Sequence, residues 1–189
     1  MIVMSACGNR LSADKFQGIQ KKLFELKGYK CTLEIKVVNN KNSTKYLVRQ
    51  MYFHPSKFRT EILEPEFMKG IITVSNGKET CVSNTNFDTN NTYVSENLIK
   101  LSGNNMLLTN FFSNYVSSEK SIMEIVGGTY RLKTYIPCET DYMEAEILCI
   151  NKQGNPESLK IFDKQGSLKV DIKYIEFVKN PRFEEGIFD

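Results

Sequence analysis

The chain has 189 residues, in which 25 lysines and arginines stand against 22 aspartates and glutamates, for a formal net charge of +3. A chain of this length is most simply one domain that buries about 70% of the surface exposed by its unfolded form, so its stability requires neither a metal nor a disulfide. The positive excess is too small and too evenly spread to indicate a nucleic-acid partner.

Residues 1–10 are expected to contain the end of a lipoprotein signal peptide and a lipid-anchored linker. The sequence Met4-Ser5-Ala6-Cys7-Gly8 fits a bacterial lipobox, in which small residues before the cysteine give a signal peptidase access to the bond. Lipid attachment at Cys7 would tether the protein to a membrane without a transmembrane helix. The alternative is an ordinary methionine start with a frayed tail. Residues 11–189 are expected to form a single domain.

Two segments have apolar residues at helical spacing. The first begins at Ser12 as N-cap and ends before Gly28, and its apolar stripe consists of Phe16, Ile19, Leu23 and Leu26. The second covers residues 106–115 and has a wider apolar arc. We expect both helices to pack on a sheet. A membrane-surface role for the first and an apolar cavity beside the second are the alternatives.

Strand patterns fill the rest of the chain, which is organised around residues 50–77. Three strands are predicted there, separated by a turn at Pro55 and a loop at 65–70. Alternation in the middle strand predicts a buried face with Phe58, Thr60 and Ile62. The opposite, solvent-exposed face has Lys57, Arg59 and Glu61. Further strands are predicted at 29–37, 46–53, 79–82, 122–126, 130–136, 143–150, 158–163 and 167–177.

Nine to eleven antiparallel strands with two helices predict an α+β fold. We expect an open, strongly curved antiparallel β half-barrel with about two helices covering its concave side. The edge strands of an open sheet leave backbone groups unpaired, so a homodimer formed through them is a further expectation.

Residues suited to catalysis are few and scattered. His54 is the single histidine, which excludes a histidine pair for a metal within one chain, and its place before a proline is typical of a turn. Arg59 and Glu61 share one face of a strand. The simplest interpretation is that they belong to a solvent-exposed pattern of charges on neighbouring strands. The five cysteines show no Cys-x-x-Cys spacing, and pairing of Cys81 with Cys138 is left open. The sequence therefore predicts no catalytic residues, cofactor or metal.

Four motifs, in their order along the chain, resemble the LolA-like lipoproteins of spore-forming Firmicutes. They are Pro-x-Lys-Phe-Arg-x-Glu-Ile-Leu-x-Pro at 55–65, Gly-Ile-Ile-Thr-Val-Ser-Asn-Gly at 70–77, Phe-Phe-x-x-Tyr at 111–115 and the late Asn180-Pro181. The resemblance covers nearly all of residues 29–188 and implies the same curved half-barrel, here LolA/LolB-like. The chain departs from many relatives at 78–82, where it has no aromatic strand, and it contains no tryptophan.

Within this family the chain is similar to the GerS-type germination lipoproteins. That resemblance implies a non-enzymatic, lipid-anchored protein that binds and activates a zinc-dependent N-acetylmuramoyl-L-alanine amidase (CwlD type) for cortex peptidoglycan modification. It implies an extracytoplasmic location, in the forespore intermembrane space or the spore, and the zinc belongs to the amidase. No partner-binding residue of this chain can be assigned from the resemblance. A lipid or lipoprotein carrier that uses an apolar cavity is the alternative function, and a sensor domain is a third.

Overall fold

The computed structural model of the chain describes residues 17–18, 21, 23, 25–39, 42–85, 107–137 and 143–189. The strands with defined bounds are β1 (Gly28–Val38), β2 (Ser43–Phe53), β3 (Lys57–Glu64), β4 (Ile71–Ser75), β5 (Thr80–Asn84), β6 (Ile122–Val126), β7 (Thr129–Tyr135), β8 (Ala145–Ile150), β9 (Pro156–Phe162) and β10 (Leu168–Lys179). The helices with defined bounds are the short 3-10 helix η1 (Glu66–Met68) and α3 (Leu108–Ser117).

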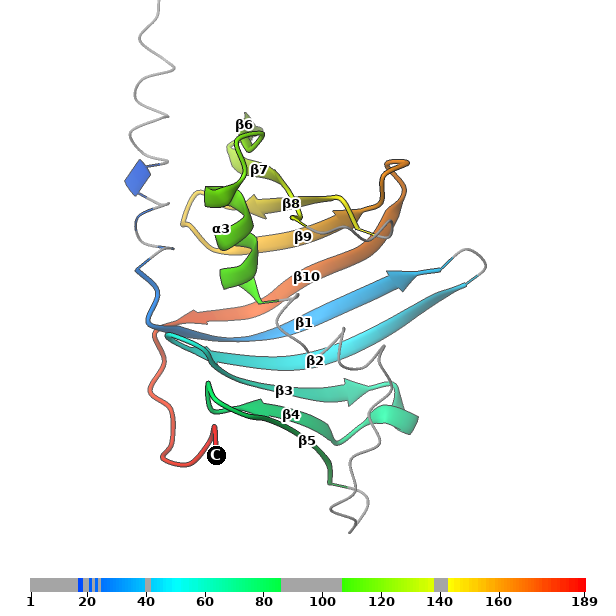
Figure 1. Cartoon of the computed structure of the whole chain (residues 1–189), viewed down its shortest axis with the longest axis vertical. Helices are drawn as coiled ribbons and strands as arrows, with labels where there is room; N and C mark the ends of the chain where they lie inside the picture. The colour runs from blue at the N-terminus through cyan, green and yellow to red at the C-terminus, as the bar shows by residue number, and fades with distance from the viewer. Residues whose placement is uncertain are drawn as a thin grey trace, which may run out of the picture.

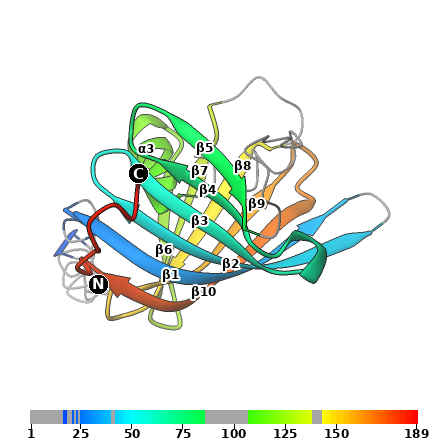
Figure 2. The same cartoon turned by 90° about the horizontal axis from the view of Figure 1, so that it is seen from below.

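All ten strands belong to one antiparallel sheet in the order β5-β4-β3-β2-β1-β10-β9-β8-β7-β6. Two meanders, β1 to β5 and β6 to β10, build its two halves, and the pairing of β1 with β10 joins them (Figure 1). The sheet is open and curved, and α3 lies against the half built by the second meander (Figures 1 and 2). Strands β5 and β6 form its two edges.

The predicted strands and the open, curved antiparallel sheet are confirmed. The prediction of about two covering helices is not matched, because the described residues contain one α-helix with defined bounds, α3. The first predicted helix falls largely outside the described residues, although residues 17–18, 21 and 23 are helical. The loop predicted at 65–70 contains η1.

The core lies on the inner face of the sheet, and α3 covers part of this face. In β1, Tyr29, Leu33 and Ile35 point inward and are at most 2% exposed, whereas Lys30 and Glu34 alternate with them on the outer face. Alternation in β3 matches the prediction, and its buried positions are Phe58, Thr60 and Ile62. Period-2 spacing therefore assigns the inner and outer faces of these strands correctly.

An apolar row crosses the inner face and ties the two halves of the sheet together. Register places side by side five residues of β7, β8, β9, β10 and β1, each at most 2% exposed: Leu132, Leu148, Leu159, Ile172 and Ile35. Burying one aliphatic side chain of this kind contributes about 1.5–3 kcal/mol relative to leaving it exposed. Packing therefore stabilises the β1–β10 junction in addition to its backbone hydrogen bonds.

Asn180 connects the end of β10 to the start of β1 through hydrogen bonds. Its Oδ1 accepts hydrogen bonds from the backbone N–H groups of Lys27 (2.9 Å) and Gly28 (3.2 Å), and its own N–H donates to the Gly28 carbonyl (2.8 Å). Its φ of 48° lies in the left-handed region, which asparagine adopts more readily than most residues. The late Asn-Pro motif therefore has a structural role where the two meanders meet.

Replacing Asn180 by alanine is expected to lower the free energy of unfolding by about 1–2 kcal/mol, because two backbone N–H groups lose their acceptor and alanine is strained at this φ. Urea unfolding followed by circular dichroism measures the change. Asn180→Asp keeps an acceptor oxygen and should lose clearly less. Equal losses in the two variants would show that these hydrogen bonds do not carry the effect.

Candidate interaction site

Helix α3 packs into the core on the inner face of the sheet. Leu108, Phe111 and Phe112 are at most 5% exposed and belong to the same cluster of buried residues as the apolar row. Their spacing of three and four positions gives the helix one apolar side. This packing is the predicted role of the helix, and the cavity predicted as its alternative stays a prediction.

Tyr29 holds the N-terminal end of α3. Its buried hydroxyl donates a hydrogen bond to Gln50 Oε1 (2.9 Å) and accepts the backbone N–H of Leu108 (3.2 Å). An N–H group in the first turn has no partner within the helix, so a tyrosine of β1 acts in place of a capping side chain. Sequence reasoning placed the helix at 106–115, two residues too early, because this cap comes from 79 positions away.

Thr134 holds the C-terminal half of α3 against β7. Its hydroxyl, which is fully buried, donates to the backbone carbonyl of Asn114 (3.1 Å). Because that hydroxyl has a single proton, it accepts in its second contact, from the hydroxyl of Ser121 (2.9 Å) just before β6. One side chain therefore fixes α3 and the start of β6 relative to β7.

Glu146 is a buried carboxyl on β8 beneath α3. It is 3% exposed, and its Oε2 accepts a hydrogen bond from Nδ2 of Asn114 (3.4 Å). Burial raises the pKa of Glu146 from its ordinary value of 4.5 to about 7, while the Asn114 hydrogen bond acts in the opposite direction. Glu146 is not among the candidate site residues that the sequence indicates. The usable signal is that Glu146 lies inside the apolar strand β8.

An exposed apolar surface surrounds the edge strand β6. Three aliphatic side chains of this strand are 43–58% exposed and form what we call the β6 edge surface: Ile122, Ile125 and Val126. Among the described strands, β6 pairs with β7 alone, so its other side presents unpaired backbone N–H and C=O groups. Glu124 is the one charged residue of β6. The strand therefore has little of the charge that usually keeps sheet edges from pairing.

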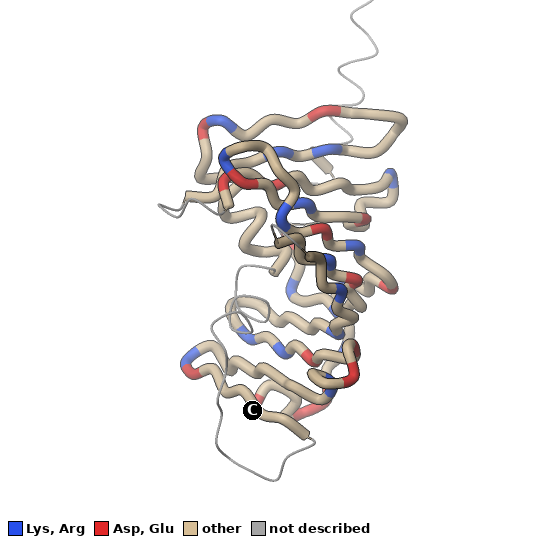
Figure 3. The backbone as a smooth tube through the Cα atoms, turned by 90° about the vertical axis from the view of Figure 1, so that its right-hand side faces the viewer, with Lys and Arg blue, Asp and Glu red and all other residues tan. Residues whose placement is uncertain are grey.

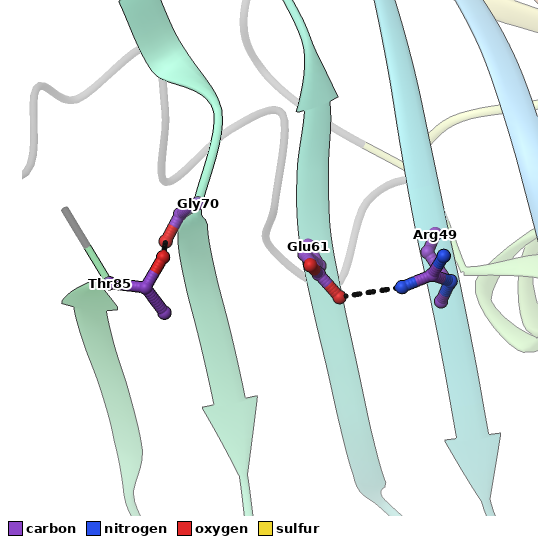
Figure 4. A network of polar contacts seen from close by, with 4 residues as sticks. All are labelled: Arg49, Glu61, Gly70 and Thr85. Carbon is purple, nitrogen blue, oxygen red and sulfur yellow. Dashed lines mark hydrogen bonds and ion pairs between the residues drawn. The ribbon is translucent and has the colours of Figure 1, made fainter.

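The opposite edge of the sheet is polar. Strand β5 has one aliphatic residue, Val82, and pairs with β4 over its whole length. Thr85 closes this end of the sheet, because its backbone N–H (3.0 Å) and its hydroxyl (3.3 Å) both donate to the carbonyl of Gly70. Figure 4 shows the hydroxyl contact. Of the two edges, β6 is therefore the one suited to an apolar partner.

The structure does not gather the predicted functional residues into one site. Cys7, the predicted lipid attachment site, lies outside the described residues, and so does Cys138. His54 lies in a turn, as predicted, and is exposed. Cys81 is an exposed free thiol, whereas Cys31 is buried, and burial raises the pKa of its thiol far above the ordinary value.

The charged residues of β3 form a cross-strand pair on the outer face. Glu61 Oε2 binds Nη1 of Arg49 on β2 at 3.0 Å (Figure 4), while Arg59 lies opposite Met51 and Val74. The side chains of the pair are 41% and 27% exposed, so the pair contributes at most about 1 kcal/mol. The predicted cross-strand charge pattern is confirmed for Glu61, with Arg49 as its partner.

Within the described ranges, no group of three or more histidine, cysteine, aspartate and glutamate side chains is placed to hold a metal ion. No helix in the described part of the chain has the length and apolar character needed to cross a membrane. The surface of the described residues that is suited to binding is the apolar edge strand β6. Contacts of Thr134 with α3 hold this edge in place.

A family model described as sporulation protein YdcC-like matches residues 1–188. The sporulation protein YdcC of Bacillus subtilis (strain 168) is 20% identical over 195 residues, a match that covers 100% of this chain and 56% of that protein. The chain therefore spans little more than half the length of this curated relative. The family match confirms the resemblance to proteins of spore-forming bacteria that the motifs indicated.

The solved structures that are similar to the chain include the following two. One is the CwlD amidase from Clostridioides difficile in complex with the GerS lipoprotein, in which a chain is 23% identical with a TM-score of 0.46, over 97% of this chain and 99% of that one. The other is the LolA superfamily protein NE2245 from Nitrosomonas europaea, 12% identical with a TM-score of 0.48, over 92% of this chain and 96% of that one.

Proposed function

Because the chain belongs to the family of YdcC-like sporulation proteins, we propose that it is a non-enzymatic, lipid-anchored protein that binds and activates an N-acetylmuramoyl-L-alanine amidase (CwlD type). The activated amidase modifies cortex peptidoglycan, and spore germination depends on that modification. The protein acts outside the cytoplasm, in the forespore intermembrane space, anchored through a lipid on Cys7. The observation that carries this proposal is the β6 edge surface.

The β6 edge is suited to accept a strand of another protein. Unpaired main-chain groups supply the hydrogen bonds of such an added strand, and pockets for alternate side chains supply specificity. By its register with β7, β6 places Ile122 and Val126 on the outer face and Ile125 on the inner face. A strand added to this edge would therefore bury aliphatic side chains on both faces, where each contributes through the apolar area removed from water.

The edge is also held in place before a partner arrives. Thr134 links β7 to the backbone of α3 and, through Ser121, to the residue before β6. A surface that is already ordered loses less conformational entropy on binding, which favours affinity. The overall resemblance of the chain to GerS-type lipoproteins supports the amidase as the occupant. The zinc chemistry in this proposal belongs to the amidase, and the chain supplies a binding surface.

The double variant Ile122→Lys and Val126→Lys places two lysines on the outer side of this edge. We expect it to lower amidase activation at least about tenfold. Charged side chains on an edge strand oppose strand pairing, and both positions are exposed, so the fold should tolerate them. The measurement is the rate of peptide release from cortex peptidoglycan by purified amidase, with and without the chain.

The matched control is Thr80→Lys together with Ser83→Lys, which adds the same two charges to the exposed positions of β5 at the other edge. It should activate the amidase within about twofold of the unmodified chain. Equal activation by both variants would remove β6 as the docking edge. If the unmodified chain gave no gain in amidase activity, the proposed function itself would be wrong.

A further inference from the structure

A row of lysines crosses the outer face of the sheet, on the side away from α3. Register aligns seven residues on β6, β7, β8, β9, β10, β1 and β2, in the order Ile122, Lys133, Ile147, Lys160, Asp171, Lys36 and Lys45. We call its four cations, Lys36, Lys45, Lys133 and Lys160, the lysine row. Figure 3 shows one side of the molecule, with basic segments on successive strands and acidic segments among them.

Charges within the lysine row repel one another. Lys36 lies directly opposite Lys45 on the neighbouring strand, an arrangement of like charges that destabilises a sheet. Lys160 and Lys133 lie two strands apart, at about 10 Å, which is close to the screening length at physiological salt. The row is therefore a place where a bound anion would relieve repulsion.

The described residues supply little negative charge to offset the row. On the neighbouring β10, Lys169 is paired with Asp163 (3.0 Å) and Lys173 with Glu34 (4.0 Å). By contrast, no described carboxylate lies within ion-pair distance of the four lysines of the row. Asp171 is the one acid in the row, and its Oδ1 is buried without a hydrogen-bond partner among the described residues.

An aromatic side chain and a further cation continue the row at its β7 end. The ring of Tyr135 has Lys133 Nζ 5.3 Å and Lys120 Nζ 5.8 Å from its centroid. Ile147 is 9% exposed between Lys133 and Lys160, as expected where lysine stems cover an apolar residue and carry their charged ends outward. The charged ends are thus directed away from the sheet, toward a ligand in solvent.

We infer that the lysine row is a binding surface for a flexible, linear polyanion such as a carboxylated glycan or a phosphate polymer. From Lys45 to Lys133 the row crosses five strand-to-strand steps, about 24 Å of arc. Because the sheet is curved, a flat bilayer would touch only part of this arc, whereas a flexible chain follows it. The row needs no amidase, so this inference stands or falls separately from the β6 edge.

The test uses the full chain with Cys7→Ser, so that no lipid is attached, and fluorescently labelled long-chain polyphosphate as the probe. The row variant replaces Lys36, Lys45, Lys133 and Lys160 by glutamine. The control variant replaces four exposed lysines near the opposite strand ends, Lys27, Lys30, Lys78 and Lys152. Both variants lower the formal net charge from +3 to −1, so a difference between them reports position and not net charge.

The row variant is expected to bind polyphosphate at least about tenfold more weakly than the unmodified chain, with a smaller salt dependence because fewer counterions are released. The control variant should stay within about threefold. Asp171→Asn removes the one negative charge of the row and should tighten binding. Equal weakening in the two lysine variants would overturn the inference. Tighter binding to phosphatidylglycerol vesicles than to polyphosphate would also overturn it, in favour of a membrane surface.

Discussion

Replacing Tyr29 by phenylalanine is expected to lower the free energy of unfolding by about 2–4 kcal/mol. The change removes one oxygen from a side chain that is 0% exposed and leaves two buried groups without partners, Oε1 of Gln50 and the N–H of Leu108. Each buried polar group left unpaired costs about 1–3 kcal/mol, and phenylalanine fills nearly the same volume, so packing changes little. Chemical denaturation gives the total effect.

Hydrogen exchange at the Leu108 amide separates a local effect on α3 from a global one. Exchange there should speed up in Tyr29→Phe by more than the loss of global stability alone requires. Tyr46→Phe is the matched control, since Tyr46 is a half-buried tyrosine on β2, and it should cost little. Adding Gln50→Leu to Tyr29→Phe should recover part of the loss, because it removes one of the unpaired groups. If Tyr46→Phe cost as much as Tyr29→Phe, the hydrogen bonds would not be the reason.

Replacing Glu146 by glutamine is expected to raise the free energy of unfolding at pH 8–9 by up to about 3 kcal/mol, with little change near pH 4. The folded state holds the carboxyl proton up to a pKa of about 7, whereas the unfolded chain releases it near the ordinary value of 4.5. The unfolded chain therefore binds fewer protons between these values, and stability falls as the pH rises through this window. Glutamine has no proton to release and keeps an oxygen to accept from Asn114.

Denaturation curves from pH 4 to pH 9 measure this dependence. The unmodified chain should lose stability between about pH 4.5 and pH 7 and then level off, and Glu146→Gln should flatten this part of the profile. Glu157→Gln, an exposed carboxyl on the adjacent β9, should follow the unmodified curve. A profile for Glu146→Gln that kept the fall between pH 4.5 and pH 7 would show that another group is responsible.

Strand positions were predictable because each strand carries its own pattern. In β1 and β3 apolar residues alternate with charged ones, and prolines and glycines mark the connections, so local sequence is sufficient. Local sequence does not predict the pairing of β1 with β10, because this pairing joins residues about 150 positions apart in the chain. The contact of Asn180 with Lys27 joins equally distant residues. The Asn180-Pro181 motif is visible in the sequence, but the sequence does not show that Asn180 contacts the backbone at the start of β1.

The parts of the candidate site that escaped prediction depend on contacts between distant residues. The start of α3 is fixed by Tyr29 of β1, so no local cap marks it. Burial of Glu146 follows from its place under α3 and not from its neighbours in sequence. The exposed character of β6 follows from its position at the edge, because the same apolar residues inside the sheet would be core.

The most direct test of the proposed function is multi-angle light scattering of the full chain with Cys7→Ser, alone and mixed with the amidase. We expect one joint peak for the mixture, lost when the chain carries Ile122→Lys and Val126→Lys and kept when it carries Thr80→Lys and Ser83→Lys. The chain alone also reports its own oligomeric state, including a homodimer through the edge strands. Separate peaks for the unmodified chain and the amidase would contradict the account and leave the inner face, as a carrier site, to be tested next.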